Sequence, residues 1–82
     1  MPPYEADKER AAAYHLTERE LEVLCLVCGG LSGKEAGGRL GIDDATARYH
    51  LSGVRRKLDT KSTAEACAKA VSLGIIRPGS PD

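Results

Sequence analysis

Residues 43–58 read Asp-Asp-Ala-Thr-Ala-Arg-Tyr-His-Leu-Ser-Gly-Val-Arg-Arg-Lys-Leu. Four apolar residues in this stretch lie three or four positions apart, which places their side chains along one face of an α-helix: Ala47, Leu51, Val54 and Leu58. Asp43 opens the stretch and is a residue type that favours the N-cap position. The stretch therefore predicts an amphipathic helix whose apolar stripe packs against the rest of the chain.

The opposite face of this predicted helix is polar and basic, with Arg48, Tyr49, Ser52 and Arg56 at helical spacing. A DNA major groove is wide enough for an α-helix, and residues in the first turns of such a helix reach the base edges. Arg48, Tyr49 and Ser52 are therefore the candidate base contacts. Arg48 suits a bidentate contact to guanine.

The end of the same helix carries three consecutive basic residues, Arg55, Arg56 and Lys57. Basic side chains in this position lie beside the phosphate backbone and add affinity without reading the sequence. The charges have a second explanation, because cations near a helix C-terminus complement the helix dipole and an exposed face needs charge. The charge pattern alone leaves both interpretations open.

Three Ser/Thr-x-x-Glu capping boxes, at Thr17, Ser32 and Ser62, mark the starts of further helices. These helices are followed by glycines that can end them: Gly29 and Gly30 after the first, Gly41 after the second and Gly74 after the third. We expect helices over about residues 17–28, 32–40, 43–58 and 62–73. No stretch alternates polar and apolar residues with period two, so we expect no strand. The predicted fold class is all-α, a small four-helix bundle that contains a helix-turn-helix and no sheet.

The chain of 82 residues has room for one small domain. Residues 1–15 begin with two prolines and become charged and alanine-rich, which predicts a flexible N-terminal segment or linker. We expect residues 16–76 to form the helical domain and residues 77–82 to form a C-terminal tail.

Twelve basic and twelve acidic residues balance, so the bulk composition does not indicate nucleic-acid binding. Their distribution is uneven, because residues 1–24 hold six acidic and three basic side chains and the remainder holds nine basic and six acidic ones. No apolar run approaches the roughly 20 residues that cross a bilayer, and no signal peptide is recognisable. We expect a soluble, cytoplasmic protein with no membrane partner.

Three cysteines, Cys25, Cys28 and Cys67, are an odd number without a repeated spacing. They predict buried reduced thiols rather than a disulfide framework. A zinc site would need a second close pair of ligands, so we expect no metal and no cofactor. No Ser/His/Asp, Cys/His or paired-carboxylate arrangement has structural support, and His50 is better explained by packing. We do not expect an enzyme.

The predicted helix over residues 62–73 has two apolar strips. One strip can face the core, whereas Thr63, Cys67 and Val71 form a second, narrow strip at steps of four residues. A partner helix would cover that second strip, which predicts a dimer interface. The alternative is that a monomer tolerates such a strip of small residues on its surface.

Four segments with their spacing intact resemble the LuxR-type (GerE-type) helix-turn-helix domain: Leu16-Thr17-x-Arg19-Glu20-x-Glu22-Val23-Leu24, Gly30-Leu31-Ser32-x-Lys34-Glu35, Leu40-x-Ile42-x-x-x-Thr46-x-x-x-His50-Leu51, and Arg56-Lys57-Leu58 followed by Glu65-Ala66. The resemblance covers residues 16–76 without a gap. It implies a four-helix DNA-binding domain of a bacterial, nucleoid-associated transcription regulator that works as a homodimer on a palindromic operator, with RNA polymerase as a further partner.

The resemblance also assigns roles by position. Arg48, Tyr49 and Ser52 match base-facing sites of the family, Thr46 and Lys57 match frequent backbone contacts, and the helix over residues 62–73 matches the dimerisation helix. With Lys34, Arg55 and Arg56, the expected phosphate contacts number five.

Two departures from the family bear on the fold. The predicted helix over residues 32–40 contains Gly37 and Gly38, each costing about 1 kcal/mol relative to alanine, and Ala36 replaces a larger aliphatic residue. We expect a marginal helix or an unusually close approach at Gly37.

The C-terminal part of the domain is similar to quorum-sensing receptors, although Leu26 stands where those receptors usually carry tryptophan.

Two functions of different class follow. The first is sequence-specific DNA binding as part of a transcription regulator. The alternative is a helical interaction module that heterodimerises with related regulators and does not bind DNA. Near-neutral charge and the weak helix over residues 32–40 are the support for the alternative.

Overall fold

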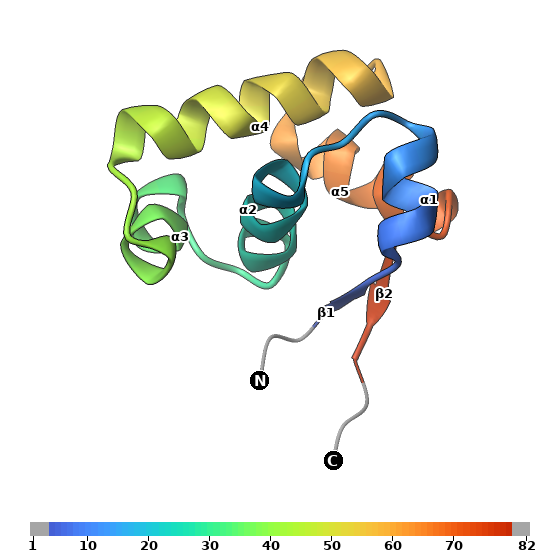
Figure 1. Cartoon of the computed structure of the whole chain (residues 1–82), viewed down its shortest axis with the longest axis horizontal. Coiled ribbons are helices and arrows are strands. Elements are labelled where there is room, and N and C mark those ends of the chain that lie inside the picture. The colour runs from blue at the N-terminus through green and yellow to red at the C-terminus, as the bar shows by residue number, and fades with distance from the viewer. Residues whose placement is uncertain (1–3, 80–82) are drawn as a thin grey trace.

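The structure, a computed structural model, describes residues 4–79. Along the chain lie strand β1 (Tyr4–Ala6), helices α1 (Lys8–Ala13), α2 (Glu18–Cys28), α3 (Gly33–Leu40), α4 (Asp44–Leu58) and α5 (Thr63–Ser72), and strand β2 (Ile76–Pro78). The longest helix, α4, lies across α2, α3 and α5, while the two strands lie on the other side of the bundle (Figure 1). The domain therefore presents one long helix at its surface.

The predicted helix starts are confirmed, because the expected side chains cap them. Thr17 and Ser32 form complete capping boxes with Glu20 and Glu35, in which the donor–acceptor distances are 2.9 and 3.1 Å. At the start of α5, Ser62 Oγ accepts the Glu65 N–H at 3.1 Å. These caps satisfy backbone N–H groups that the first turn of a helix leaves unpaired.

The prediction that the fold contains no sheet is wrong. β1 pairs antiparallel with β2, with Tyr4 opposite Pro78, Glu5 opposite Arg77 and Ala6 opposite Ile76. Strands of three residues are too short for a period-two pattern to be recognised, and this pairing joins opposite ends of the chain. The fold is thus mostly helical with a small two-stranded sheet.

Part of the segment expected to be a flexible linker is packed on the domain. Asp7 caps α1 by accepting the Arg10 N–H at 3.0 Å, and its own N–H donates to the Ile75 carbonyl at 2.8 Å. Ala11 of α1 is buried. Residues 1–3 and 80–82, at the outer ends of the expected linker and tail, lie outside the described residues.

The core confirms the predicted apolar stripe of α4. Ala47, Leu51, Val54 and Leu58 are all buried. Val54 and Leu58 join the main cluster with Leu24 of α2, whereas Leu51 packs with residues of α2 and α3. One face of α4 is therefore packed against the bundle, and the opposite face is exposed to solvent.

α3 forms despite its glycines, through the close approach that the sequence suggested. A Cβ added to Gly37 would lie 2.8 Å from the Ile42 carbonyl oxygen and 3.4 Å from Ala47 Cβ. Ala36 beside it is fully buried. Small residues at this joint allow α3 and the following turn to pack tightly against α4.

None of the helices between residues 4 and 79 is long and apolar enough to span a membrane.

Candidate nucleic-acid interface

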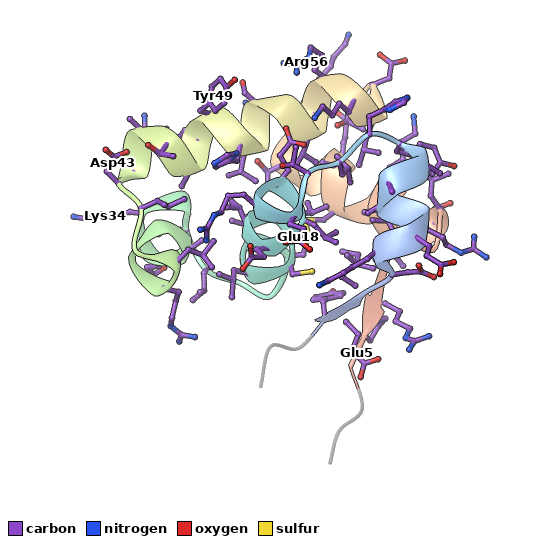
Figure 2. All side chains as sticks on the ribbon, viewed as in Figure 1. Glu5, Glu18, Lys34, Asp43, Tyr49 and Arg56 are labelled. Atoms are coloured by element: carbon purple, nitrogen blue, oxygen red, sulfur yellow. A yellow bond between two sulfur atoms is a disulfide. The ribbon has the colours of Figure 1, made fainter. Side chains whose placement is uncertain are left out.

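The outer face of α4 carries the three predicted base-contact residues, and all three are exposed. Tyr49 is 74% exposed, which is unusual for a large aromatic residue, and its ring meets the His50 ring edge-on at 5.7 Å between centroids. Tyr49 and Arg56 point away from the bundle on the same side of α4 (Figure 2). This face is polar and belongs to an exposed α-helix, and a DNA major groove is wide enough to admit such a helix.

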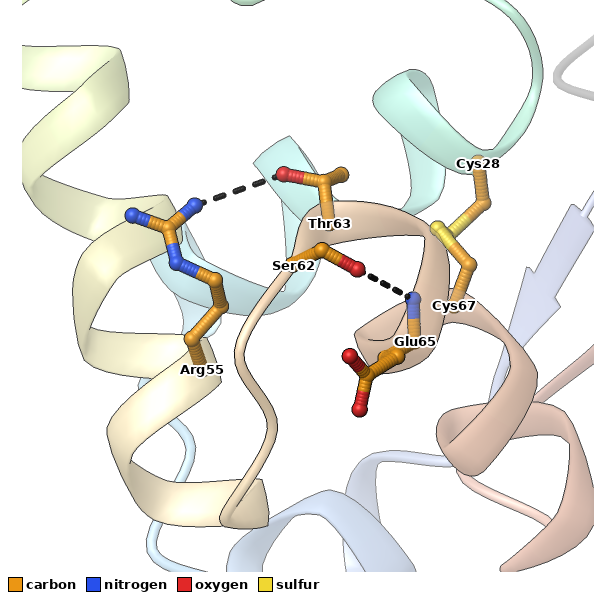
Figure 3. The surroundings of a disulfide bond; sticks show 6 residues. All are labelled: Cys28, Arg55, Ser62, Thr63, Glu65 and Cys67. Carbon is orange, nitrogen blue, oxygen red and sulfur yellow. Dashed lines mark hydrogen bonds between the residues drawn. A yellow bond between two sulfur atoms is a disulfide. The ribbon is translucent and has the colours of Figure 1, made fainter.

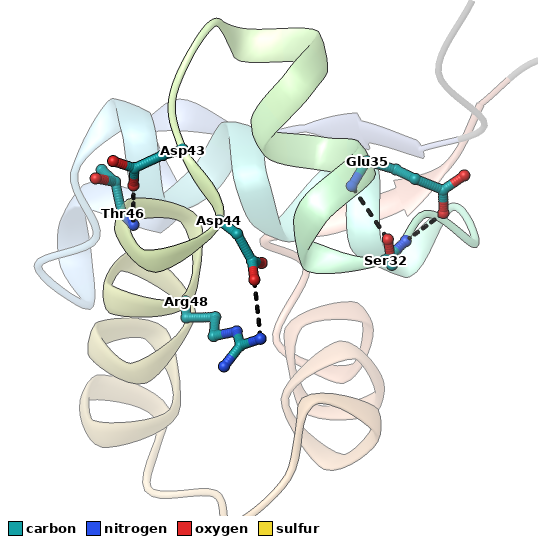
Figure 4. A network of polar contacts seen from close by, with 6 residues as sticks. All are labelled: Ser32, Glu35, Asp43, Asp44, Thr46 and Arg48. Atoms are coloured by element: carbon teal, nitrogen blue, oxygen red, sulfur yellow. Dashed lines mark hydrogen bonds and ion pairs between the residues drawn. The ribbon is translucent and has the colours of Figure 1, made fainter.

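Arg48 is held by an acidic residue one turn earlier. Its Nη2 lies 2.8 Å from Asp44 Oδ2, and the Arg48 side chain is nevertheless 75% exposed. The guanidinium is turned toward the start of α3 (Figure 4). Asp43 accepts the Thr46 N–H at 2.7 Å, as expected of the predicted N-cap, whereas Asp44 pairs with Arg48.

A cleft of about 430 Å³ brings together three predicted contact residues that are far apart in the sequence: Lys34, Arg48 and Arg55. The start of α3, α4 and Thr63 of α5 form its walls. Lys34 is exposed in the first turn of α3. The cleft therefore places a group of cations beside the outer face of α4.

Arg55 connects α4 to α5. Its Nη1 donates to Thr63 Oγ1 and its Nη2 donates to Ser52 Oγ, each at 3.3 Å (Figure 3). Arg55 is half-buried, whereas Arg56 beside it is exposed. The two arginines thus differ, because Arg55 already has two partners within the domain and Arg56 extends into solvent.

Lys57 is turned away from the exposed face. Its Nζ lies 2.6 Å from Glu20 Oε1 of α2, and the two side chains are only 21% and 7% exposed. Burial raises the pKa of Glu20, but hydrogen bonds from Lys57 and from the Thr17 N–H outweigh burial and leave the pKa below its usual value. Sequence analysis recognised Glu20 as a capping residue and missed this pairing, which has no local sequence signal.

Thr46 and Asp43 build the start of α4. The hydrogen bonds from Thr46 hold the pKa of the Asp43 carboxyl below its usual value. Thr46 is half-buried at the end of α4 that faces α3. Its backbone N–H thus has a partner in Asp43, and the phosphate contact of Thr46 stays a prediction.

The prediction of reduced thiols is wrong for two of the three cysteines. Cys28 at the end of α2 and Cys67 in α5 form a disulfide, with their Cα atoms 5.7 Å apart and 39 residues between them in sequence. Cys25 is free and buried. An odd number of cysteines does not exclude one pair, and helix packing creates this one without any motif in the sequence.

The disulfide also bears on the predicted dimer strip of α5. Cys67 is bonded within its own chain and Thr63 accepts a hydrogen bond from Arg55, so both side chains are engaged inside the domain. Val71 is 41% exposed and is the most accessible member of the strip.

The described residues, 4–79, contain no group of three His, Cys, Asp or Glu side chains that could hold a metal ion.

Comparisons with known proteins agree with this geometry. Residues 14–70 match the family model described as bacterial regulatory proteins of the luxR family. The transcriptional activator protein CarR of Pectobacterium carotovorum is 40% identical over 61 residues, covering 74% of this chain and 25% of CarR. The quorum sensing-dependent transcriptional regulator RpaR of Rhodopseudomonas palustris is 40% identical over 62 residues, covering 76% of this chain and 26% of RpaR.

A solved structure agrees as well. The crystal structure of the phage VqmA–DPO complex superposes with a TM-score of 0.71 at 29% identity, covering 83% of this chain and 34% of that one. The chain spans about a quarter of the length of the curated relatives it matches. Because the family model covers well over half of its residues, the chain belongs to the luxR family of bacterial regulatory proteins.

Proposed function

We propose that this chain is the sequence-specific DNA-binding part of a bacterial transcription regulator and that α4 enters the major groove. The single observation that carries the proposal is the exposed face of α4, where Arg48, Tyr49 and Ser52 project from a helix whose other face is buried. Arg48 has the donors for a bidentate contact to guanine. The ring of Tyr49 contacts a thymine methyl, a sugar or a phosphate.

The proposed phosphate contacts lie in three places. Lys34 and Arg55 act at the cleft, Thr46 acts at the start of α4, and Arg56 acts on the outer face of α4. Lys57, which the sequence placed with them, contributes mainly to the domain itself because Glu20 holds its ammonium.

The regulator acts as a homodimer on a palindromic operator, with Val71 at the centre of the α5 contact. The exposed apolar side chain of Val71 supports this arrangement. A contact with RNA polymerase completes the proposed regulator in the cytoplasm, at the nucleoid. CarR, a transcriptional activator, and RpaR, a quorum sensing-dependent transcriptional regulator, support the assignment to transcription regulation.

The test is selection of binding sites from a random duplex pool with the purified chain. We expect a symmetric consensus, an affinity at least about 10³-fold higher than for unrelated duplex, and a steep decline of affinity with salt. Arg48→Ala should remove discrimination at one base pair of each half-site. Equal binding to all sequences, or none at low salt, would contradict the proposal. The absence of DNA binding at low salt would favour the module that heterodimerises with related regulators.

A further inference from the structure

The first turn of α4 contains a negative charge that the proposed function does not use. Asp43 is the N-cap and accepts the Thr46 N–H. Asp44 follows it, is not needed for capping, and has its carboxylate 2.8 Å from the Arg48 guanidinium. A carboxylate beside a surface that faces phosphates weakens binding through like-charge repulsion. Its position next to the principal base-contact residue therefore calls for a physical explanation.

The contact restricts a side chain that is otherwise mobile. A free arginine side chain carries about 2 kcal/mol of rotamer entropy. Arg48 is exposed over three quarters of its surface, so packing does little to orient it. The bond through Nη2 leaves other guanidinium donors unoccupied, and a guanidinium has five. Arg48 thus combines a fixed direction with free hydrogen-bonding capacity.

The carboxylate of Asp44 lies near the start of α3. A Cβ added to Gly33 of α3 would lie 3.7 Å from Asp44 Oδ1 (Figure 4). Lys34 and Arg55 line the same cleft and are the other cations there. Neither has its ammonium or guanidinium paired with Asp44, whereas Arg48 does.

We propose that Asp44 is a positioning residue that sets base specificity. It holds the Arg48 guanidinium toward a guanine edge and keeps phosphate oxygens away from it by repulsion. Arg48 then reads a base instead of serving as one more phosphate contact. Asp44 lowers the affinity for every duplex and raises the preference for the correct one. This inference rests on the proposed function, in which α4 enters the major groove.

The chain supplies its own matched control. Asp43→Asn removes a charge one residue away, keeps the cap because asparagine is an equally good N-cap residue, and does not alter the Asp44–Arg48 pair. Asp44→Asn removes the charge and weakens the pair with nearly the same shape. Asp44→Glu keeps the charge and can restore the pair. Helical circular dichroism and melting temperature establish that each variant is folded.

The experiment measures binding of these variants, and of Arg48→Ala, to the selected duplex, to its single-base substitutions and to an unrelated duplex. Asp44→Asn and Asp43→Asn should both bind the unrelated duplex more tightly, by roughly threefold each at low salt. Only Asp44→Asn should lose discrimination, by roughly tenfold and at the base pair that Arg48 reads. Asp44→Glu should recover part of the lost discrimination. In the Arg48→Ala background, Asp44→Asn should have no further effect on selectivity.

The outcomes separate the two proposals. Wild-type protein without sequence preference would overturn the proposed function and this inference together. A selective wild type whose base profile is unchanged in Asp44→Asn would overturn the positioning role alone. A change of preference at a different base pair would also overturn it, because Asp44 would then contact a base directly.

Discussion

Glu20 of α2 and Lys57 of α4 form an ion pair of 2.6 Å inside the domain, and the same carboxylate oxygen accepts the Thr17 N–H at 2.9 Å. One side chain thus closes the capping box of α2 and anchors the C-terminal half of α4. Glu20 is 5% exposed and is the buried charged residue among those that the structure describes. This contact adds to the buried apolar stripe that packs α4 on the bundle.

Replacing Glu20 by glutamine should destabilise the domain by about 2–3 kcal/mol. The amide retains an acceptor for the cap but leaves the largely buried Lys57 ammonium without its counter-charge. Urea unfolding followed by circular dichroism measures the loss. Glu18→Gln is the control, because the Lys8–Glu18 pair is exposed at 3.5 Å and should contribute less than about 0.5 kcal/mol. Equal effects of the two substitutions would contradict the importance of the buried pair.

The stability should also depend on Glu20 in acid. The folded pKa of Glu20 lies below the ordinary value of 4.5, so the unfolded chain binds the proton more readily than the folded one. The resulting stabilisation is complete above pH 4.5 and is lost as the pH falls through the folded pKa. We expect the urea midpoint of the wild type to fall more steeply below pH 4.5 than that of Glu20→Gln. Parallel curves would show that other carboxyls, such as Asp43 and Glu35, dominate.

Gly37 and Gly38 should respond to alanine with opposite signs although they are adjacent in α3. At Gly37 the new Cβ would press on the Ile42 carbonyl oxygen, which belongs to the backbone and cannot move aside easily, so we expect a loss of about 1–3 kcal/mol. At Gly38 the Cβ meets nothing within 4 Å, and the better helix propensity should stabilise by about 0.5–1 kcal/mol. Thermal unfolding of both variants gives the comparison. A stabilised Gly37→Ala would mean that α3 does not approach α4 this closely.

The contrast between these elements shows what the sequence could predict. The sequence signal for a helix start is local, because a capping box spans only four residues. The caps at Thr17, Ser32 and Asp43 were all expected. The buried stripe of α4 follows from spacing alone. The exposed base-contact face follows from the same spacing, because it is the opposite side of that stripe.

Contacts between distant segments had no such local signal. The β1–β2 pairing joins residues 70 to 74 positions apart, and each strand has only three residues. The Glu20–Lys57 pair and the Cys28–Cys67 disulfide depend on how α2 packs against α4 and α5. Lys57 follows Arg56 by one residue, about 100° further around α4, so its ammonium meets Glu20. The phosphate contact of Lys57 stays a prediction.

The disulfide should account for a substantial part of the stability. A crosslink spanning 39 residues restricts the unfolded chain and typically contributes about 2–4 kcal/mol. Reduction, or the double substitution Cys28→Ala and Cys67→Ala, should lower the free energy of unfolding by this amount, and reductant should have no effect on the double variant. Thiol titration in denaturant should find one thiol without reductant, that of Cys25, and three with it. Three thiols without reductant would contradict the disulfide.

Arg56 should contribute to affinity without contributing to specificity. It is exposed on the outer face of α4 and lies in the last turn, past the proposed base contacts. Arg56→Ala should weaken binding to the selected and the unrelated duplex by the same factor and reduce the slope of log K against log salt by about 1. Arg77→Ala is the control, because Arg77 lies in β2, on the side of the bundle away from α4, where Glu5 pairs with it at 3.1 Å (Figure 1). A loss of base discrimination in Arg56→Ala would place Arg56 at a base edge. An equal loss of affinity in Arg77→Ala would show that net charge, and not the face of α4, governs binding.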